Sequence, residues 1–305
     1  MNWLPLFVAS AFSHPDVHSA TAIHFPTADS SWPVIESNWG FFLHRESGWQ
    51  WVCPESLGVT GLYNLAIRED RQWGVGTLDG LWSTVDQCGF THSFEGQFVT
   101  DIQVDGNDIW VATGTGYMEN QLWRSVDGGL NFEVFGDFGS GVRLFSFLID
   151  EDMHWVSGSA DGIQTLWWRT DEEQEWTDID LSSTGLGWIE FLGRDPENSG
   201  KVWFSSTLAD STLWSVDVLG QMQAHLSSEE KIATLGFFNE WLIASGESGF
   251  HVSEDLGETW EGPWIEPEVA CIVPHREHLY VCSHNWQDGA AVMRTKGVGH
   301  PSTWE

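Results

Sequence analysis

The chain has 305 residues, of which 41% are hydrophobic, so it can bury a sizeable core and is not expected to be disordered. It contains 45 acidic and only 12 basic residues, which gives a formal net charge of −33 at pH 7. Such a surface repels phosphate groups, so we expect no binding to nucleic acid and no attraction to anionic lipid.

The chain begins with a short apolar run. Residues 4–12 carry no charged side chain, and residues 9–11 (Ala-Ser-Ala) are the small residues that a signal peptidase prefers. This pattern predicts a signal peptide over residues 1–13 and a secreted or periplasmic mature protein. A hydrophobic first strand is the alternative, because no Lys or Arg precedes the run. No stretch is long and apolar enough to predict a transmembrane helix.

A unit of two apolar strands, joined by a short loop and followed by a polar turn, occurs seven times. The units span residues 32–48, 72–89, 109–129, 154–173, 202–220, 240–257 and 279–297. Their turns are centred on Glu46, Asp86, Asp127, Asp171, Asp217, Asp255 and Gly297, which are 40, 41, 44, 46, 38 and 42 residues apart. This period is typical of the four-stranded blades of a β-propeller.

Each unit has one more apolar segment before it, such as VTDIQV or WIEFL, and a short strand after it, such as NFEVF. The sequence therefore predicts an all-β fold: a seven-bladed β-propeller of four-stranded antiparallel blades, forming a single domain over residues 14–305. The last blade ends in HPSTWE, with only a stub of its fourth strand. The ring then closes either with a strand from residues 14–19 or by blade packing alone.

The turns between the third and fourth strands (C and D) carry a Ser-x-Asp-x-Gly-x-Thr-Trp pattern, complete in VSEDLGETWEG. We expect structural roles for Ser125, Asp127, Gly129, Phe132, Ser253, Asp255, Gly257, Thr259 and Trp260. In such a turn the Ser and Asp oxygens accept bonds from backbone N–H groups, Gly permits a positive φ, and the aromatic ring packs between sheets. Folding alone explains the pattern.

With these turns the chain resembles the Asp-box (BNR) repeat propellers, a group that includes sialidases and sortilin-type receptors. The stretches ESGWQWVCPESLG (46–58) and VGTLDGLWSTVDQCGF (75–90) are similar to secreted sialidase-like propellers of myxobacteria and related deltaproteobacteria. The resemblance implies a fold rather than an activity. The arginine cluster and the Phe-Arg-Ile-Pro element of sialidases are not recognisable, since Arg45, Arg124, Arg169 and Arg294 all lie just before or within the C–D turns.

Acidic residues occur in each of the seven loops between the second and third strands (B and C), on the face where propellers commonly bind ligands. They are Glu36, Asp79, Glu119, Asp161, Asp210, Glu247 and Asp288. We expect a ring that holds a cation, with Ca²⁺ suited to its oxygen ligands, or a basic partner. A general excess of surface acids is the alternative. Near the same loops, Trp39, Tyr117 and Trp286 either stack on a sugar or a peptide, or pack between blades.

Four cysteines fit an oxidising compartment. If Arg276-Glu277 is the turn of a hairpin, Cys271 and Cys282 face each other at a distance that a disulfide spans; two small buried residues are the alternative. Cys53 and Cys88 lie in different repeats, and their spacing fixes no pairing.

The sequence has no phosphate-binding loop, serine-nucleophile elbow or Cys-x-x-Cys motif. We therefore expect a monomeric binding propeller, without catalysis or cofactor, whose B–C face takes a glycan, a cation or a protein ligand. One alternative is a glycoside hydrolase that uses a carboxylate pair on the same face. Another is a scaffold whose surface serves only in assembly.

Overall fold

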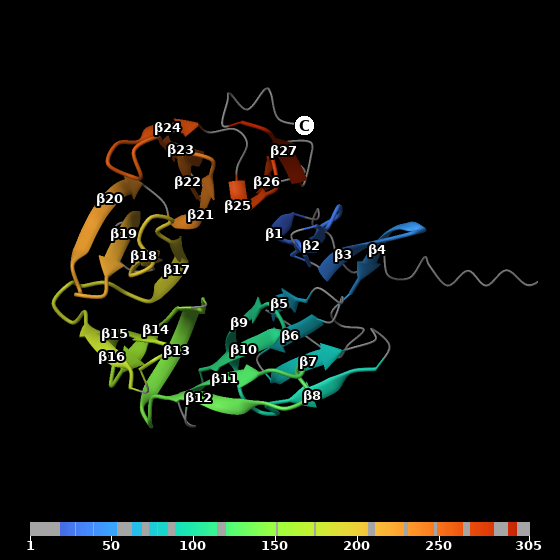
Figure 1. Cartoon of the computed structure of the whole chain (residues 1–305), viewed down its shortest axis with the longest axis horizontal. Helices are drawn as coiled ribbons and strands as arrows, with labels where there is room; N and C mark the ends of the chain where they lie inside the picture. Colours follow the sequence, from blue (N-terminus) through green and yellow to red (C-terminus); the bar gives the residue numbers. More distant parts are fainter. Residues whose placement is uncertain are drawn as a thin grey trace, which may run out of the picture.

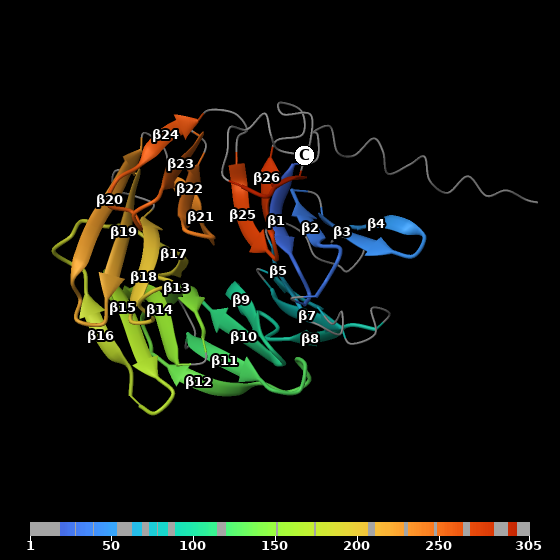
Figure 2. The ribbon, with the colours of Figure 1, turned by 45° about the horizontal axis from the view of Figure 1, so that its top comes forward.

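The computed structural model describes residues 19–297, except 28, 39, 54–62, 69–72, 78, 85–88, 115–119, 151, 174, 207–210, 229–230, 247–248, 265–268 and 284–291. Every regular element in this part of the chain is a β-strand, and it contains no helix long and apolar enough to span a membrane. The strands form seven antiparallel sheets (Figure 1), and the tilted view of Figure 2 shows them around one axis. The predicted seven-bladed β-propeller is confirmed.

Within each blade the strands pair in chain order, from the axis outward. Blade 1 contains β1 (Ala20–His24), β2 (Val34–Ser37), β3 (Gly40–Arg45) and β4 (Gly48–Val52). Blade 2 contains β5 (Tyr63–Ile67), β6 (Trp73–Thr77), β7 (Gly80–Thr84) and β8 (Thr91–Ser93). Blade 3 contains β9 (Val99–Asp105), β10 (Asp108–Thr113), β11 (Gln121–Ser125) and β12 (Glu133–Asp137). Blade 4 contains β13 (Val142–Leu148), β14 (Met153–Ala160), β15 (Ile163–Thr170) and β16 (Thr177–Asp180).

The other three blades follow the same plan. Blade 5 contains β17 (Ile189–Arg194), β18 (Lys201–Ser206), β19 (Ser211–Asp217) and β20 (Met222–Ser228). Blade 6 contains β21 (Ile232–Phe238), β22 (Trp241–Gly246), β23 (Gly249–Ser253) and β24 (Glu261–Trp264). Blade 7 contains β25 (Val269–His275), β26 (His278–Ser283) and β27 (Val292–Thr295) in the described part, and the stub predicted at the end of the chain lies outside it.

The core lies between the blades. One apolar cluster occupies each of the seven seams, and each draws its side chains from two successive sheets. The second strands, covered on both faces, read as nearly continuous apolar or small residues, as in β10 (DIWVAT) and β22 (WLIASG). The fourth strands are mostly exposed, as in β4 and β16. Burial therefore decreases from the inner strands to the rim.

Two of the C–D turns are held by a Ser–Asp pair. In blade 6 the Ser253 hydroxyl donates to Asp255 Oδ1 (2.8 Å) and accepts from the Gly257 N–H (2.8 Å), while Asp255 Oδ1 accepts from the Thr259 N–H (2.8 Å). Gly257 has a φ of +90°, which Gly adopts without strain. The Trp260 indole N–H donates to the Gly257 carbonyl (3.1 Å). Ser125, Asp127, Gly129 and Asn131 repeat these contacts in blade 3.

These hydrogen bonds lower the pKa values of the two Asp carboxyl groups in the turns. The side chain and N–H of Asn131, with the Ser125 hydroxyl, lower the pKa of Asp127 to about 2. The side chain and N–H of Thr259, with the Ser253 hydroxyl, do the same to Asp255. Both carboxylates are therefore ionised at neutral pH, as hydrogen-bond acceptors of the turn must be.

The ring closes where blade 7 meets blade 1. Ala20 and Ile23 of β1 pack with Cys271 and Cys282 of blade 7 in one apolar cluster. Residues 14–18 lie outside the described part of the chain, so only the packing of the blades is observed at this seam.

Candidate functional site

Seven residues, one from each first strand, occupy equivalent positions near the axis. In blade 3, Val99 pairs with Thr113 and Asp101 pairs with Ala112, and a bulge at Thr100 separates the two pairs. The residues that pair with the position equivalent to Ala112 form a ring of Ala22, Asn64, Asp101, Ser146, Glu190, Thr234 and Cys271; a bulge precedes this position in blades 1, 3, 4, 6 and 7 but not in blades 2 and 5. Because each second strand ends at its B–C turn, this ring lies at the B–C face.

Polar side chains at this level join neighbouring blades. The Asn64 amide donates to the Thr100 carbonyl (3.0 Å), and Asp101 Oδ2 accepts from the Phe147 N–H (3.0 Å). Gln103, two residues further along β9, donates to the Phe147 carbonyl. These bonds fix the first strands of blades 2, 3 and 4 relative to one another.

Blades 2 to 5 line a pocket of about 340 Å³ at this end of the axis. Its polar side chains include the ring members Asn64, Asp101, Ser146 and Glu190, and its aromatic side chains include Phe145 and Trp188. We call it the channel-mouth pocket. Its size falls within the range typical of small-molecule and peptide side-chain sites.

Asp101 is the most perturbed acid in the pocket. Burial raises its pKa to about 6, and the N–H groups of Phe147 and Ile102 and the Ser146 hydroxyl counter only part of this effect. The negative charge of Glu190 raises the pKa further. Asp101 retains some solvent contact through the pocket, but protein from two blades supplies most of its surroundings. At neutral pH its carboxylate is therefore mostly charged, at a cost in folding free energy.

Glu190 and Trp188 form the more accessible wall. Glu190 makes an exposed ion pair with Lys231, which contributes little to stability. The Trp188 indole is 55% exposed and stacks on Phe145, with 5.1 Å between the ring centroids and 21° between the planes. One face of the indole is thus fixed by Phe145 while much of its surface remains in solvent.

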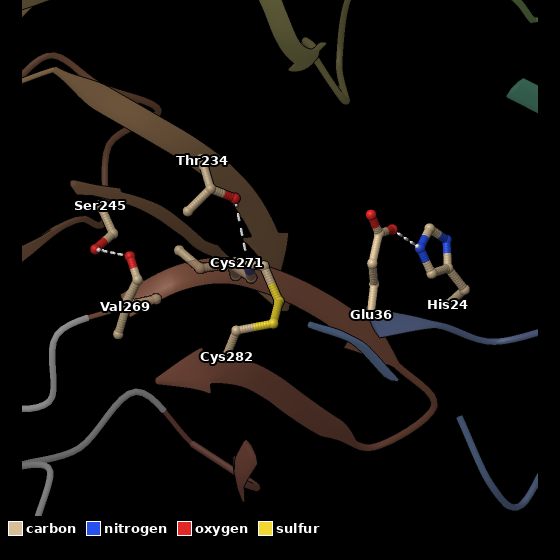
Figure 3. The surroundings of a disulfide bond; sticks show 8 residues. His24, Glu36, Thr234, Ser245, Val269, Cys271 and Cys282 are labelled. Carbon is tan, nitrogen blue, oxygen red and sulfur yellow. Dashed lines mark hydrogen bonds and ion pairs between the residues drawn. A yellow bond between two sulfur atoms is a disulfide. The ribbon is translucent and has the colours of Figure 1, made fainter. Parts of the chain in front are cut away.

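Of the seven acids expected in the B–C loops, the three that the structure describes lie outside this pocket. Glu36 lies within β2, not in the loop after it, and bonds His24 (3.1 Å; Figure 3). Asp79 and Asp161 lie in B–C turns, and the Asp79 carboxylate accepts from the Gly96 N–H (2.9 Å). None of the three lines the pocket. The others, Glu119, Asp210, Glu247 and Asp288, lie outside the described residues, as do Trp39, Tyr117 and Trp286.

The described residues contain no group of three or more His, Cys, Asp or Glu side chains arranged to hold a metal ion. Cys271, a member of the ring, forms a disulfide with Cys282 between β25 and β26, with 4.9 Å between their Cα atoms (Figure 3). Cys88 lies outside the described part of the chain.

The residues that matter in the pocket were not singled out in the sequence. Asp101 and Glu190 each interrupt an apolar first strand, in VTDIQV and WIEFL, and an acid in the innermost strand of a blade is the signal that could have identified them. Trp188 was not distinguishable among 21 tryptophans.

No family model and no curated protein matches the chain. Among solved structures it is similar to YCF48 bound to D1 peptide, at 13% identity, covering 81% of this chain and 82% of that one, with a TM-score of 0.58. It is also similar to the Dos1 propeller, at 10% identity over 91% and 78% of the two chains, with a TM-score of 0.60.

A further similar structure is PorZ, a surface component of the type-IX secretion system of Porphyromonas gingivalis. The identity is 12% and the TM-score is 0.58. The match covers 92% of this chain but only 38% of the PorZ chain. At such identities these likenesses establish the fold only. The chain is a seven-bladed β-propeller.

Proposed function

We propose that this chain is a secreted or periplasmic Asp-box propeller that binds, without catalysis, a basic segment of a polypeptide in the channel-mouth pocket. The observation that supports the proposal is the placement of an exposed indole, Trp188, beside two carboxylates, Asp101 and Glu190, in one pocket. The protein acts as a monomer and needs no cofactor for this function.

The chemistry of the pocket favours a cation. A Lys or Arg side chain over the face of Trp188 gains a cation–π interaction, and Glu190 adds an ionic hydrogen bond by exchanging its exposed ion pair with Lys231 for one with the ligand. The neutral polar groups offer less, because the amides of Asn64 and Gln103 already donate to backbone carbonyls. The net charge of −33 also attracts a basic ligand over a longer range and thereby raises its rate of association.

A polypeptide is favoured over a lone ion by two considerations. The described residues offer no metal-binding cluster, and a pocket of about 340 Å³ accommodates a long side chain together with its backbone. YCF48, which shares the propeller fold, has been solved with a peptide bound. This likeness supports a peptide ligand without identifying it.

The test is a titration of fluorescein-labelled hexalysine into the full chain, followed by anisotropy. Trp188→Ala is expected to weaken binding about tenfold and Glu190→Gln about fivefold. Glu133→Gln removes one exposed charge on the outer strand β12 and is the matched control; its affinity should stay within about twofold of the native chain. Equal losses in Glu190→Gln and Glu133→Gln would show that only the overall charge attracts the peptide.

Glycoside hydrolysis is the second candidate, because the pocket pairs a carboxyl group of raised pKa, Asp101, with a second acid, Glu190. In that reaction Asp101 would protonate the leaving group, and Glu190 would act as the base or the nucleophile. Turnover of a fluorogenic glycoside that is abolished in both Asp101→Asn and Glu190→Gln would replace the binding-only function. Turnover that persists in both variants would come from elsewhere.

A further inference from the structure

The seams between blades differ in how they are covered at the rim. In blade 3 the C–D turn reaches back over blade 2, where Phe132 packs against Phe94 at 4.9 Å between ring centroids. In blade 6 the corresponding turn brings Gly257 and Trp260 against Trp203 and its neighbours in blade 5. In both blades, the Ser–Asp turn therefore fills the outer half of the preceding seam.

Blade 1 lacks such a cover. Its C–D turn consists only of Glu46 and Ser47, between Arg45 and Gly48, which pair with each other. A two-residue turn is too short to reach blade 7. The outer half of the seam between blades 7 and 1 is therefore left without the turn that fills the seams before blades 3 and 6.

The inner half of the same seam is well packed by the segment between β1 and β2. Phe25 stacks on His275, with 3.6 Å between ring centroids and 4° between the planes. His275 Nε2 is hydrogen bonded to the Ser30 carbonyl at 2.9 Å. Blade 1 is thus fixed against blade 7, and the opening beside this contact has a defined shape.

The opening is a groove of about 440 Å³, lined mainly by Trp32, Ile35, Trp49, Tyr280, Val292 and Met293. We call it the seam groove. Trp32 is 55% exposed and Trp49 46% exposed. Trp32 lies flat on His44 at 4.2 Å and stands almost perpendicular to Trp49, at 87° and 6.0 Å between centroids. The two indoles form a rigid corner that remains largely in solvent.

We infer that the seam groove is a second binding site, distinct from the channel-mouth pocket, and that it takes a neutral oligosaccharide. A pyranose ring has a flat face of C–H groups that packs on an exposed indole, while its hydroxyl groups stay in water at the edge. Two indoles at right angles hold one sugar ring between them or two successive rings. Ser31, Tyr280 and Arg294 also line the groove, and their side chains are of the types that hydrogen bond to sugar hydroxyls.

The charge of the molecule selects among sugars. The net charge of −33 repels uronic and sialic acids from the molecule as a whole, whereas neutral sugars are not repelled; the groove itself has one charged lining residue, Arg294. The groove also has the size of a typical small-ligand site, and its lining is mostly apolar with a few polar groups. A neutral glycan satisfies both constraints.

The experiment is a glycan array, probed with the labelled full chain, that carries neutral and anionic oligosaccharides. The strongest neutral glycan is then titrated by calorimetry. Trp32→Ala and Trp49→Ala should each lower affinity at least about tenfold, and Trp32→Phe should retain part of it. Trp51→Ala is the matched control, because Trp51 is on the same strand as Trp49 but does not line the groove; its affinity should stay within about twofold.

Three results would overturn the inference: no neutral glycan binds, anionic glycans bind better than neutral ones, or Trp51→Ala loses as much affinity as Trp49→Ala. A concentration-dependent dimer, seen by light scattering and lost in Trp49→Ala, would assign the groove to a second copy of the chain instead. The hexalysine titration of Trp32→Ala should match that of the native chain, so failure of this site and failure of the channel-mouth pocket are distinguishable.

Discussion

Replacing Asp101 by asparagine tests whether its carboxylate serves the fold or the ligand. Asn has nearly the same shape but no charge. In the native chain Asp101 Oδ1 accepts from the Ile102 N–H (2.8 Å) and Oδ2 accepts from the Phe147 N–H (3.0 Å). Asn has only one acceptor oxygen for these two donors. If the two bonds were the reason for Asp101, the variant would lose about 1–3 kcal/mol of stability.

The electrostatics predict the opposite sign. Burial raises the pKa of Asp101 from 3.8 to about 6, so the folded state favours the neutral acid. A raised folded-state pKa contributes stability that is present below the unfolded value and lost as pH rises through the folded value. Above neutral pH the ionised carboxylate therefore costs about 3 kcal/mol relative to a neutral group. Asp101→Asn should gain about 3 kcal/mol at about pH 7.5 and about 1.5 kcal/mol at about pH 5.

The measurement is urea denaturation of the native chain and the variant across this pH range, followed by tryptophan fluorescence. Taking the difference between the two proteins cancels the titration of the other acids. Glu133→Gln, on the exposed strand β12, should show no such dependence on pH. A variant that is less stable than the native chain at neutral pH, or a difference that is flat with pH, would refute the reasoning and assign Asp101 to the fold.

Three further predictions concern the framework. Ser253→Ala should lower the free energy of unfolding by about 1–3 kcal/mol, because the buried Gly257 N–H loses its acceptor, whereas Ser47→Ala in the exposed turn of blade 1 should not. Removing the Cys271–Cys282 disulfide, which spans 11 residues, should cost about 2 kcal/mol in urea denaturation, and an unchanged midpoint would contradict this. Carboxyl titration by NMR should find Asp255 still ionised at about pH 3; protonation nearer pH 4 would exclude the described turn contacts.

The blades were predictable because their signals are local. Each hairpin and C–D turn needs residues that accept particular backbone angles and bonds, such as Gly257 with its positive φ, and these recur at a fixed period. The fold could be predicted without knowing which blades contact one another. The same argument located the B–C face, since the direction of each strand follows from the hairpin order.

The channel-mouth pocket was not predictable, because a bulge sets the position of Asp101 and blades far apart in the sequence supply the other side chains. The bulge at Thr100 shifts the pairing of β9 by one residue, so Asp101 pairs with Ala112 and lies in the pocket. Alternation in VTDIQV carries no trace of this shift. Glu190 on β17 and Trp188 just before it lie almost 90 residues from Asp101 in the chain, so their proximity arises only from the curvature of successive blades around the axis. The acidic residues of the B–C loops could be recognised in the sequence, but those that the structure describes do not line the pocket.

Some blades carry a residue or a turn that the equivalent position of the other blades lacks, and these differences indicate where the molecule does more than hold its fold. A small neutral residue is sufficient for the fold at the ring position: Thr234 accepts from the Ile272 N–H of the next blade, and Ala22 has no polar side chain at all. An acid there costs desolvation energy that the fold does not require, so the half-buried Asp101 implies another use for its charge. The shortened turn of blade 1 is the same kind of departure, because it leaves two indoles exposed at a seam, whereas the turns of blades 3 and 6 pack Phe132 and Trp260 over the seams before them. The stability of Asp101→Asn therefore bears on more than this one residue. A gain in stability at neutral pH supports the inference that positions where the repeat pattern is broken are binding sites.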